Sequence, residues 1–132
     1  MKKIRGILVT PNEAGTKPRE YVLDYTNYES LYPLLNCSTF DIQTRRFGKF
    51  ELDIYIDDEG GLKEDNKAAL VTVDDQNKII EVMFGNIFVV SHTEDGDIKS
   101  LTTEEVKVVL ETMIDLVHKK TLQTITVLKA TL

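Results

Sequence analysis

The sequence predicts an α+β domain in which a mainly antiparallel sheet of five to seven strands packs against one long C-terminal helix and one short helix. Short segments rich in Ile, Val, Tyr and Thr recur along the chain between turns rich in Gly, Asn and Asp, which is typical of antiparallel strands. Near the C-terminus, apolar residues recur instead at spacings of three and four, as in an amphipathic helix. The 132 residues match the size of a single domain, expected to span residues 1–132.

Two strand pairs are expected in the first half of the chain. Residues 3–9 and 21–25 have the composition of strands, and the segment between them contains two prolines and a glycine, which indicates a long loop. Residues 40–47 and 50–56 form the clearest hairpin, because apolar and polar residues alternate along the second segment. The Gly48-Lys49 pair between them suits a two-residue type II′ turn.

A short helix is expected near residue 30, with its start left open. Thr26 and Glu29 have the spacing of a capping box and favour a start near Asn27. Pro33 favours a start at Ser30, because a proline is tolerated only in the first turn of a helix.

The long helix is expected to begin at Thr102 and to carry Lys119 and Lys120 near its C-terminus, where they complement the helix dipole. Thr102 and Glu105 form a second capping box. The apolar positions that recur at helical spacing and are expected to face the core are Val106, Val109, Leu110, Met113, Leu116 and Val117.

Three further segments complete the prediction. Residues 66–73 fit either a short helix or a strand. Residues 79–84 and 86–90 have the composition of β structure interrupted at Gly85-Asn86, a pair typical of a bulge or a tight turn. A last strand, rich in Thr, Ile and Val, is expected at residues 122–128.

Charge and composition restrict the function classes. The chain carries 22 acidic and 16 basic side chains, a net charge of −6, which disfavours nucleic acid as a partner. No apolar run is long enough to span a bilayer, and the apolar stretch after the basic N-terminus is too short for a signal peptide. A single cysteine, Cys37, rules out an internal disulfide. An acidic cytoplasmic protein with no membrane association is therefore expected.

The order of motifs in the middle of the chain resembles one family. A strand ends in the acidic-Gly turn of residues 57–61, an Asn-x-x-Ala segment begins at Asn66, a Gly-Asn strand follows at residues 84–90, and Leu101-Thr102 opens a helix. This order resembles the small phage and plasmid proteins known as domain of unknown function 3846, over residues 28–113. The sequence departs from the family at residues 36–38, where small residues or glycine are usual. The resemblance implies a mobile genetic element in a bacterial cell and no established activity.

No constellation in the sequence favours an enzyme. The acidic residues at 57–59, 64 and 65 lack the alternating spacing of a cation-binding loop, so a solvated turn is expected rather than a metal site. Cys37 with His92 or His118 lacks any local nucleophile motif. There is no phosphate loop, zinc spacing or dinucleotide fingerprint, and hence no cofactor is expected.

Six residues are candidates for ligand binding. Arg45 and Arg46 form a basic island, and one of them is expected on the same sheet face as Tyr55, where the pair would suit an anion or a nucleotide. The alternative is a cross-strand ion pair of these arginines with Glu51 or Asp53. The resemblance adds Asn66, Gly85 and Asn86, although a β-bulge explains the last two equally well.

Two functions of different classes follow. The first is a non-enzymatic accessory protein of a phage or other mobile element that binds a host protein, with a homodimer possible. An exposed apolar patch or a symmetric dimer face would mark it, and the threonine-rich last strand would serve for pairing if it lay at a sheet edge. The second is a binding protein for a small nucleotide-like or anionic ligand, marked by a concave pocket with an aromatic and convergent polar groups.

Overall fold

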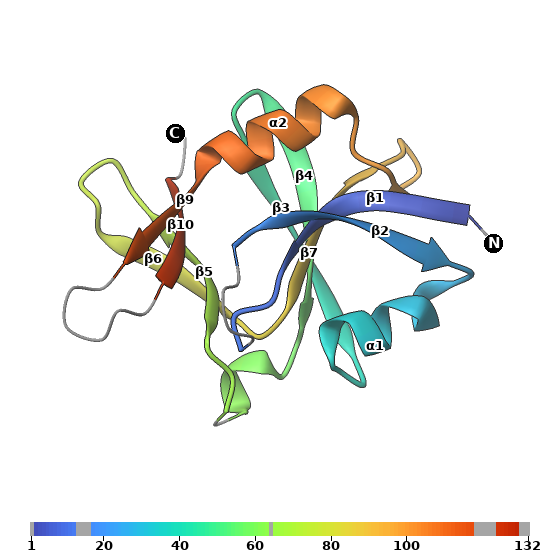
Figure 1. Cartoon of the computed structure of the whole chain (residues 1–132), viewed down its shortest axis with the longest axis horizontal. Coiled ribbons are helices and arrows are strands. Elements are labelled where there is room, and N and C mark those ends of the chain that lie inside the picture. The colour runs from blue at the N-terminus through green and yellow to red at the C-terminus, as the bar shows by residue number, and fades with distance from the viewer. Residues whose placement is uncertain (1, 13–16, 64, 118–123, 130–132) are drawn as a thin grey trace.

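A computed structural model describes residues 2–12, 17–63, 65–117 and 124–129 (Figure 1). The helices are α1 (Leu31–Leu35) and α2 (Thr103–Thr112), with single 3-10 turns η1 (Tyr28–Ser30) and η2 (Gly60–Leu62). The strands are β1 (Lys2–Val9), β2 (Arg19–Tyr25), β3 (Phe40–Phe47), β4 (Phe50–Asp57), β5 (Ala68–Val73), β6 (Ile79–Phe84), β7 (Ile87–His92), β8 (Ile98–Lys99), β9 (Met113–Val117) and β10 (Thr124–Lys129).

The strands form two sheets rather than the single one expected. The larger sheet has the order β2-β1-β7-β4-β3, with β8 paired to β7, and all of its pairs are antiparallel. The smaller sheet has the order β6-β5-β10-β9 and contains one parallel pair, β5 with β10. The α+β class and the mainly antiparallel pairing are thus confirmed, whereas the described strands number ten instead of five to seven.

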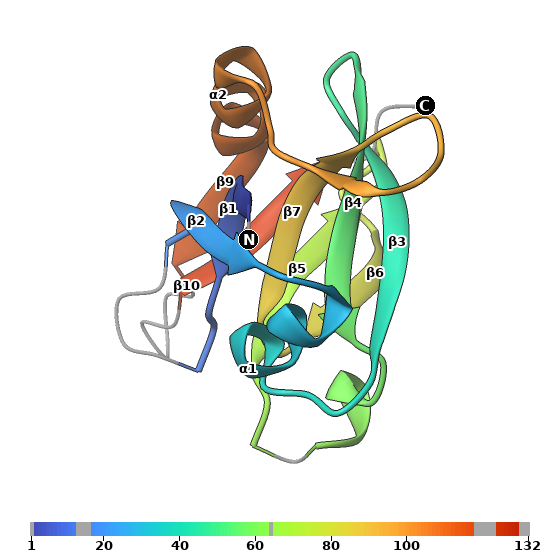
Figure 2. The same cartoon turned by 90° about the vertical axis from the view of Figure 1, so that its right-hand side faces the viewer.

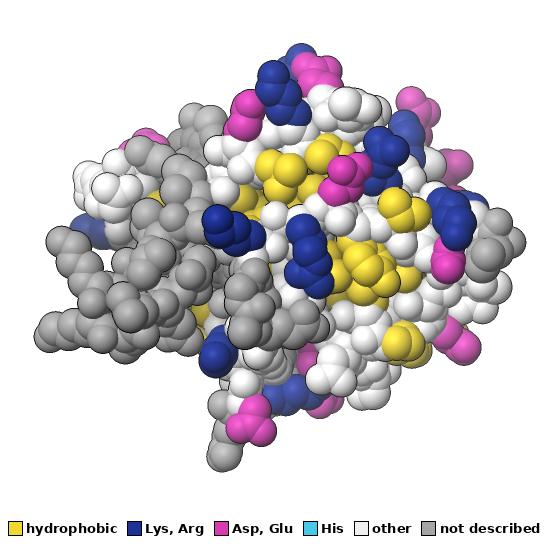
Figure 3. All heavy atoms as spheres, in the orientation of Figure 1, with side chains coloured by type: hydrophobic (Ala, Val, Ile, Leu, Met, Phe, Trp, Pro, Cys, Tyr) yellow, Lys and Arg dark blue, Asp and Glu magenta, His cyan; other side chains and the backbone are white. Residues whose placement is uncertain are grey.

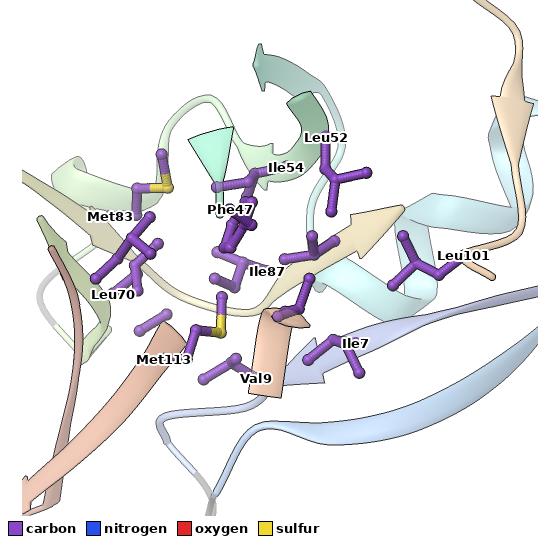
Figure 4. Packing of buried hydrophobic residues seen from close by; sticks show 14 of the residues in the cluster. Ile7, Val9, Phe47, Leu52, Ile54, Leu70, Met83, Ile87, Leu101 and Met113 are labelled. Carbon is purple, nitrogen blue, oxygen red and sulfur yellow. The ribbon is translucent and has the colours of Figure 1, made fainter. Parts of the chain in front are cut away.

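Both faces of the larger sheet are buried. On one face, side chains such as Ile7, Ile54 and Val89 pack against α2 and against Leu70, Met83 and Leu128 of the smaller sheet, where they form the main core (Figure 4). Because most side chains in this cluster are almost inaccessible to solvent, it contributes the largest share of the hydrophobic stabilisation.

The opposite face is covered by α1. Leu31 and Leu35 of this short helix pack on Leu8, Leu23 and Phe88 of the sheet. Figures 1 and 2 show α1 and α2 on opposite sides of the strands of the larger sheet. Burial from both sides explains why residues 87–90 are an unbroken apolar run rather than an alternating one.

The long C-terminal helix is the main error of the sequence prediction. Thr102 caps α2 through the expected box with Glu105, but the helix ends at Thr112, after ten residues. Met113 has extended dihedral angles, and residues 113–117 pair with β10 as strand β9. The spacing of the apolar residues beyond Thr112 fits both a helix and a strand, and the pairing with β10, from Val117 with Thr124 to Met113 with Leu128, decides the outcome.

Burial along α2 confirms part of its predicted apolar stripe. Val106, Val109 and Met113 are buried, but Leu110 is exposed. The side chains of Leu116 and Val117, now on β9, are outside the described part of the structure. The predicted last strand corresponds to β10, and its first two residues, 122 and 123, also lie outside the described residues, as do Lys119 and Lys120.

Of the remaining local predictions, the hairpins are confirmed, and those for Thr26 and for Gly85-Asn86 are not. Both N-terminal hairpins are confirmed, and Gly48 has the positive φ, 60°, that the first central residue of a type II′ turn requires. The segment 66–73 is a strand from Ala68 onwards. Asn27 caps the η1 turn, and α1 follows it at Leu31, so Thr26 does not act as the cap. Gly85-Asn86 is neither a bulge nor a hairpin turn, because the chain crosses there from β6 of the smaller sheet to β7 of the larger one.

Candidate functional site

Arg45 forms an ion pair with Glu81, a residue that the sequence did not suggest. Its Nε donates to Oε1 of Glu81 at 2.9 Å, and its Nη2 donates to Oε2 of the same carboxylate, so the contact has two points. The carboxylate raises the pKa of the Arg45 guanidinium. Arg45 pairs with Leu52 in the hairpin and therefore shares the sheet face that is turned towards the smaller sheet. This arginine joins the two sheets.

Arg46 and Tyr55 do not form the expected platform. Arg46 donates to Oε1 of Glu51 at 3.3 Å, which is the cross-strand ion pair weighed as the alternative. Tyr55 is only 5% exposed and packs against Phe40 on the face covered by α1. Its burial raises the pKa of the phenol to about 12. Of the two arginines, Arg46 shares the sheet face of Tyr55, as expected of one of them, and Arg45 lies on the opposite face.

Asn66 and Gly85 lie together and form a structural junction. The Nδ2 of Asn66 donates to the carbonyl oxygen of Gly60 at 3.1 Å, and its Oδ1 accepts from Nδ2 of Asn12 at 3.0 Å. Gly85, with φ at 83°, lies against the Asn66 amide, which a Cβ at position 85 would approach to 3.1 Å. These contacts connect three loops next to the crossing between the sheets, and they use both polar atoms of the Asn66 side chain.

Asn86 lines a cleft. The cleft has a volume of about 360 Å³ and lies between the β1–β2 hairpin and α1. Asn86 contributes to its wall, and its Nδ2 donates to the carbonyl oxygen of Leu34 at 3.0 Å. In Figure 3, hydrophobic side chains are visible at the surface between β2 and α1. Polar groups of Thr10, Arg19 and Ser30 also line the cleft. Asn86 and Arg19 thus reach it from segments more than 60 residues apart.

A second candidate is an apolar surface on β6, which we call the β6 strip. It comprises Ile79, Ile80, Val82 and Phe84, exposed by 66%, 57%, 37% and 37%. Leu62, 83% exposed, extends it, because the neighbouring Gly61 lies beside the Phe84 ring. β6 is an edge strand of the smaller sheet, so the strip borders solvent on two sides.

The acidic residues weighed as a metal site are held in local contacts where the structure describes them. Asp57 is buried, pairs with Lys63 through its Oδ2 at 2.5 Å and accepts from the Glu59 amide at 3.0 Å. Thr39 donates to Asp58. The described residues contain no group of three His, Cys, Asp or Glu side chains arranged to hold a metal ion, and Glu64 and His118 fall outside them.

Cys37 and His92 lie in different parts of the fold. Cys37 follows α1, and its burial, together with the charge of Asp57, raises the pKa of its thiol to about 11. His92, on β7, contacts Oδ1 of the buried Asp53 at 3.3 Å, and Thr44 donates to the same oxygen at 2.8 Å. The pairing of Cys37 with His92 that a nucleophile would require is not formed.

Sequence reasoning missed Arg19, Thr10 and the β6 strip. One signal for the strip was present: residues 79–84 are apolar at every position except Glu81, whereas a half-buried strand alternates. The smaller sheet offers burial on one face of β6 only, so the excess apolar residues remain outside. No comparable local signal marks Arg19, because its role depends on the position of α1.

No helix among the described residues is long and apolar enough to cross a membrane. No curated protein and no solved structure is significantly similar to the chain. One family model matches, that of the domain of unknown function DUF3846, and the match covers residues 4–115. It confirms the resemblance seen in residues 28–113 and extends it to the β1–β2 hairpin and to the start of β9. Since the match spans most of the chain, the protein belongs to the DUF3846 family.

Proposed function

We propose that the chain is a non-enzymatic accessory protein of a phage or other mobile element, and that it binds a host protein in the bacterial cytoplasm. The observation that carries the proposal is the β6 strip. Edge strands in monomeric proteins are usually protected by charged side chains, and large exposed apolar patches mark interaction sites. Here the only charged residue of β6, Glu81, is turned inward to Arg45 and leaves the apolar residues outside.

The shape of β6 favours recognition through side chains rather than through strand addition. The register between β5 and β6 shifts twice, between Ala68 and Leu70 and between Thr72 and Val73. Such bulges bend an edge strand and make it a poor template for a further strand. An apolar surface of the partner that packs on Ile80, Val82 and Phe84 is therefore the contact we expect.

Charge indicates the kind of partner. The chain has a net charge of −6, so two copies repel each other, and a partner with basic residues around its apolar surface is attracted. The threonine-rich last strand is not the pairing edge considered in the sequence analysis, because β10 lies between β5 and β9. The likeness of residues 28–113 to small phage and plasmid proteins supports the assignment to a mobile element.

The test compares capture by matched variants. Wild-type protein, the Ile80→Glu variant and the Ile42→Glu variant are immobilised and exposed to bacterial lysate, and bound proteins are quantified by mass spectrometry. Ile42 is a suitable control because it is exposed, on β3 of the larger sheet. We expect one protein that wild type and Ile42→Glu retain equally and that Ile80→Glu loses at least tenfold.

Reconstitution then decides the proposal. The captured protein, purified separately, should bind wild type in titration calorimetry, more weakly at high salt, and should not bind Ile80→Glu. If no protein is lost selectively with Ile80→Glu, the proposal is overturned. A dimer in analytical ultracentrifugation that Ile80→Glu dissociates would instead make a second copy the occupant of the strip, and would likewise overturn the host-protein assignment.

A further inference from the structure

We propose that the cleft between the β1–β2 hairpin and α1 binds a small anion with a flat, largely apolar body, of the size of a nucleoside monophosphate. The cleft and the β6 strip belong to different sheets, so this inference is independent of the proposed function. The volume of about 360 Å³ lies near the lower end of the range of roughly 300–1,000 Å³ found for ligand pockets. A mononucleotide-sized molecule fits that volume.

One wall of the cleft carries a positioned cation. Arg19 lies on β2 opposite Leu8, and its Nη1 donates to Oγ1 of Thr10 at 2.9 Å. Thr10 is buried, so this bond fixes the orientation of the guanidinium at the cleft. A guanidinium is the side chain best matched to carboxylate and phosphate oxygens, because its planar N–H groups contact two oxygens at once. Arg19 therefore sets the charge of the ligand.

Asn86 offers a hydrogen-bond acceptor to the cleft. The Nδ2 of Asn86 donates to the Leu34 carbonyl oxygen, which holds the amide in one orientation. Within the described part of the chain, no hydrogen bond reaches the Oδ1 of Asn86. This oxygen is available to accept from an N–H or O–H group of a ligand, as a nucleobase or a ribose provides. Asn86 therefore favours a ligand with a donor at some distance from its anionic group.

The surface between these polar groups is apolar and rigid. Leu8 and Leu23 form the base of the cleft and are buried in the core under α1. The Tyr21 ring stands edge-on to Phe88, with centroids 6.2 Å apart, which holds it at the rim. Leu34 approaches from α1. A flat body is suited to this space, because it buries apolar area against leucine and tyrosine while its edges reach Arg19 and Asn86.

The sequence predicts a ligand of this class at Arg45, Arg46 and Tyr55. Those side chains are engaged in ion pairs or buried away from one another. Of the six residues predicted to bind a ligand, Asn86 alone lines the cleft. The residues that bind a ligand of this chemistry are therefore a different set, centred on Arg19.

The experiment is a titration of the purified chain by isothermal calorimetry. The probes are the 5′-monophosphates of adenosine, guanosine, cytidine and uridine, the matching nucleosides, and inorganic phosphate. We expect saturable binding of at least one monophosphate at submillimolar concentration, with its nucleoside and inorganic phosphate each at least tenfold weaker. Such a pattern requires both the anion contact and the apolar body.

Three variants locate the binding. Arg19→Gln should weaken binding of the preferred monophosphate at least tenfold and leave binding of its nucleoside unchanged. Asn86→Asp should also weaken binding of the monophosphate, because the substitution brings a negative charge to the cleft. Arg46→Gln removes an equal charge from an exposed ion pair outside the cleft and should bind like wild type.

Three results would overturn the inference. The first is that no monophosphate saturates below 1 mM. The second is that inorganic phosphate binds as tightly as the monophosphate, which leaves no role for the apolar walls. The third is that Arg46→Gln and Arg19→Gln weaken binding equally, which would mean attraction to net charge only. Because Arg19 is exposed, its substitution is expected to leave the chain folded, and circular dichroism of each variant verifies this.

Discussion

Arg45 and Glu81 form a two-point ion pair that connects the last strand of one sheet to the edge strand of the other. Arg45 lies on β3, at the end of the larger sheet, and Glu81 lies on β6, at the end of the smaller one. Each side chain is 30% exposed, so the pair is partly shielded from water. Since Glu81 and Met83 point inward, the alternation of the strand turns Val82 and Phe84 outward. The same contact that attaches β6 therefore presents the β6 strip.

A double-mutant cycle measures this link. Arg45→Gln, Glu81→Gln and the double variant, compared by urea denaturation, should give a coupling free energy of about 1 kcal/mol, because the pair is bidentate and half-buried. The Arg46–Glu51 pair is the matched control. Its side chains are 48% and 63% exposed, and its coupling should be close to zero. Equal coupling in the two cycles would contradict a special role of Arg45.

The contact of Gly60 with β6 gives a second prediction. A Cβ at position 60 would lie 2.5 Å from the carbonyl oxygen of Phe84, which is backbone and has no room to move. Gly60→Ala should therefore lower the free energy of unfolding by about 1–3 kcal/mol, the usual range for overpacking. Gly61→Ala is the control, since its Cβ would meet only the Phe84 ring, at an ordinary 3.7 Å. It should be neutral or slightly stabilising, and thermal unfolding of both variants makes the comparison.

Local features of the fold were predictable and long-range ones were not. The β3–β4 hairpin follows from alternation and from Gly48, all within 18 residues of chain, and the Thr102 box marks the start of α2. The end of α2 did not follow, because Met113–Val117 is a strand only through its pairing with β10. The two-sheet arrangement depends on the crossing at Gly85-Asn86, which locally resembles a bulge.

The candidate sites also combine local features that the sequence predicts with long-range contacts that it does not. The charge of Arg45 is evident in the sequence, but its partner Glu81 is 36 residues away and on another sheet. Asn86 was named from the family resemblance, without the cleft that it lines. Arg19 was placed in a long loop, and its proximity to Asn86 results from the pairing of β1 with both β2 and β7. Such contacts between distant segments are set by tertiary packing, which local patterns do not encode.

The capping box at the start of α2 gives a third prediction. Oγ1 of Thr102 accepts from the Glu105 amide at 3.1 Å, and the Glu105 carboxylate accepts from the Thr102 amide at 2.8 Å. Thr102→Ala should cost about 1 kcal/mol in the free energy of unfolding. Thr103→Ala, one residue into the helix, removes a similar side chain without a cap and should change stability by less than about 0.5 kcal/mol. Urea denaturation of the two variants distinguishes them, and equal losses would mean that the box does not stabilise the helix.

Cys37 gives a fourth prediction, on thiol reactivity. Burial, and after it the charge of Asp57, raises the pKa of the thiol from 9.0 to about 11. The thiolate fraction at neutral pH is therefore about 100-fold smaller than for an unperturbed thiol, and the thiolate is the nucleophile. Alkylation of the folded protein by iodoacetamide at pH 8 should be correspondingly slower than alkylation of the urea-unfolded chain. Equal rates would show that the thiol is exposed and unperturbed.

The same shift predicts a loss of stability at alkaline pH. A group whose pKa is higher in the folded than in the unfolded state binds its proton more tightly when the chain is folded. Its contribution to the free energy of unfolding is therefore complete below the unfolded pKa, and it is lost as the pH rises through the folded pKa. For Cys37 this window runs from pH 9.0 to about 11, and for Tyr55, whose burial raises the pKa of its phenol from 10.0 to about 12, it lies one unit higher. Cys37→Ala should therefore flatten the decline in unfolding free energy between pH 9 and 11, while the decline above pH 11 persists because Tyr55 still titrates there. Urea denaturation at a series of pH values measures both slopes, and an unchanged slope between pH 9 and 11 would show that Cys37 titrates alike in the folded and unfolded chains.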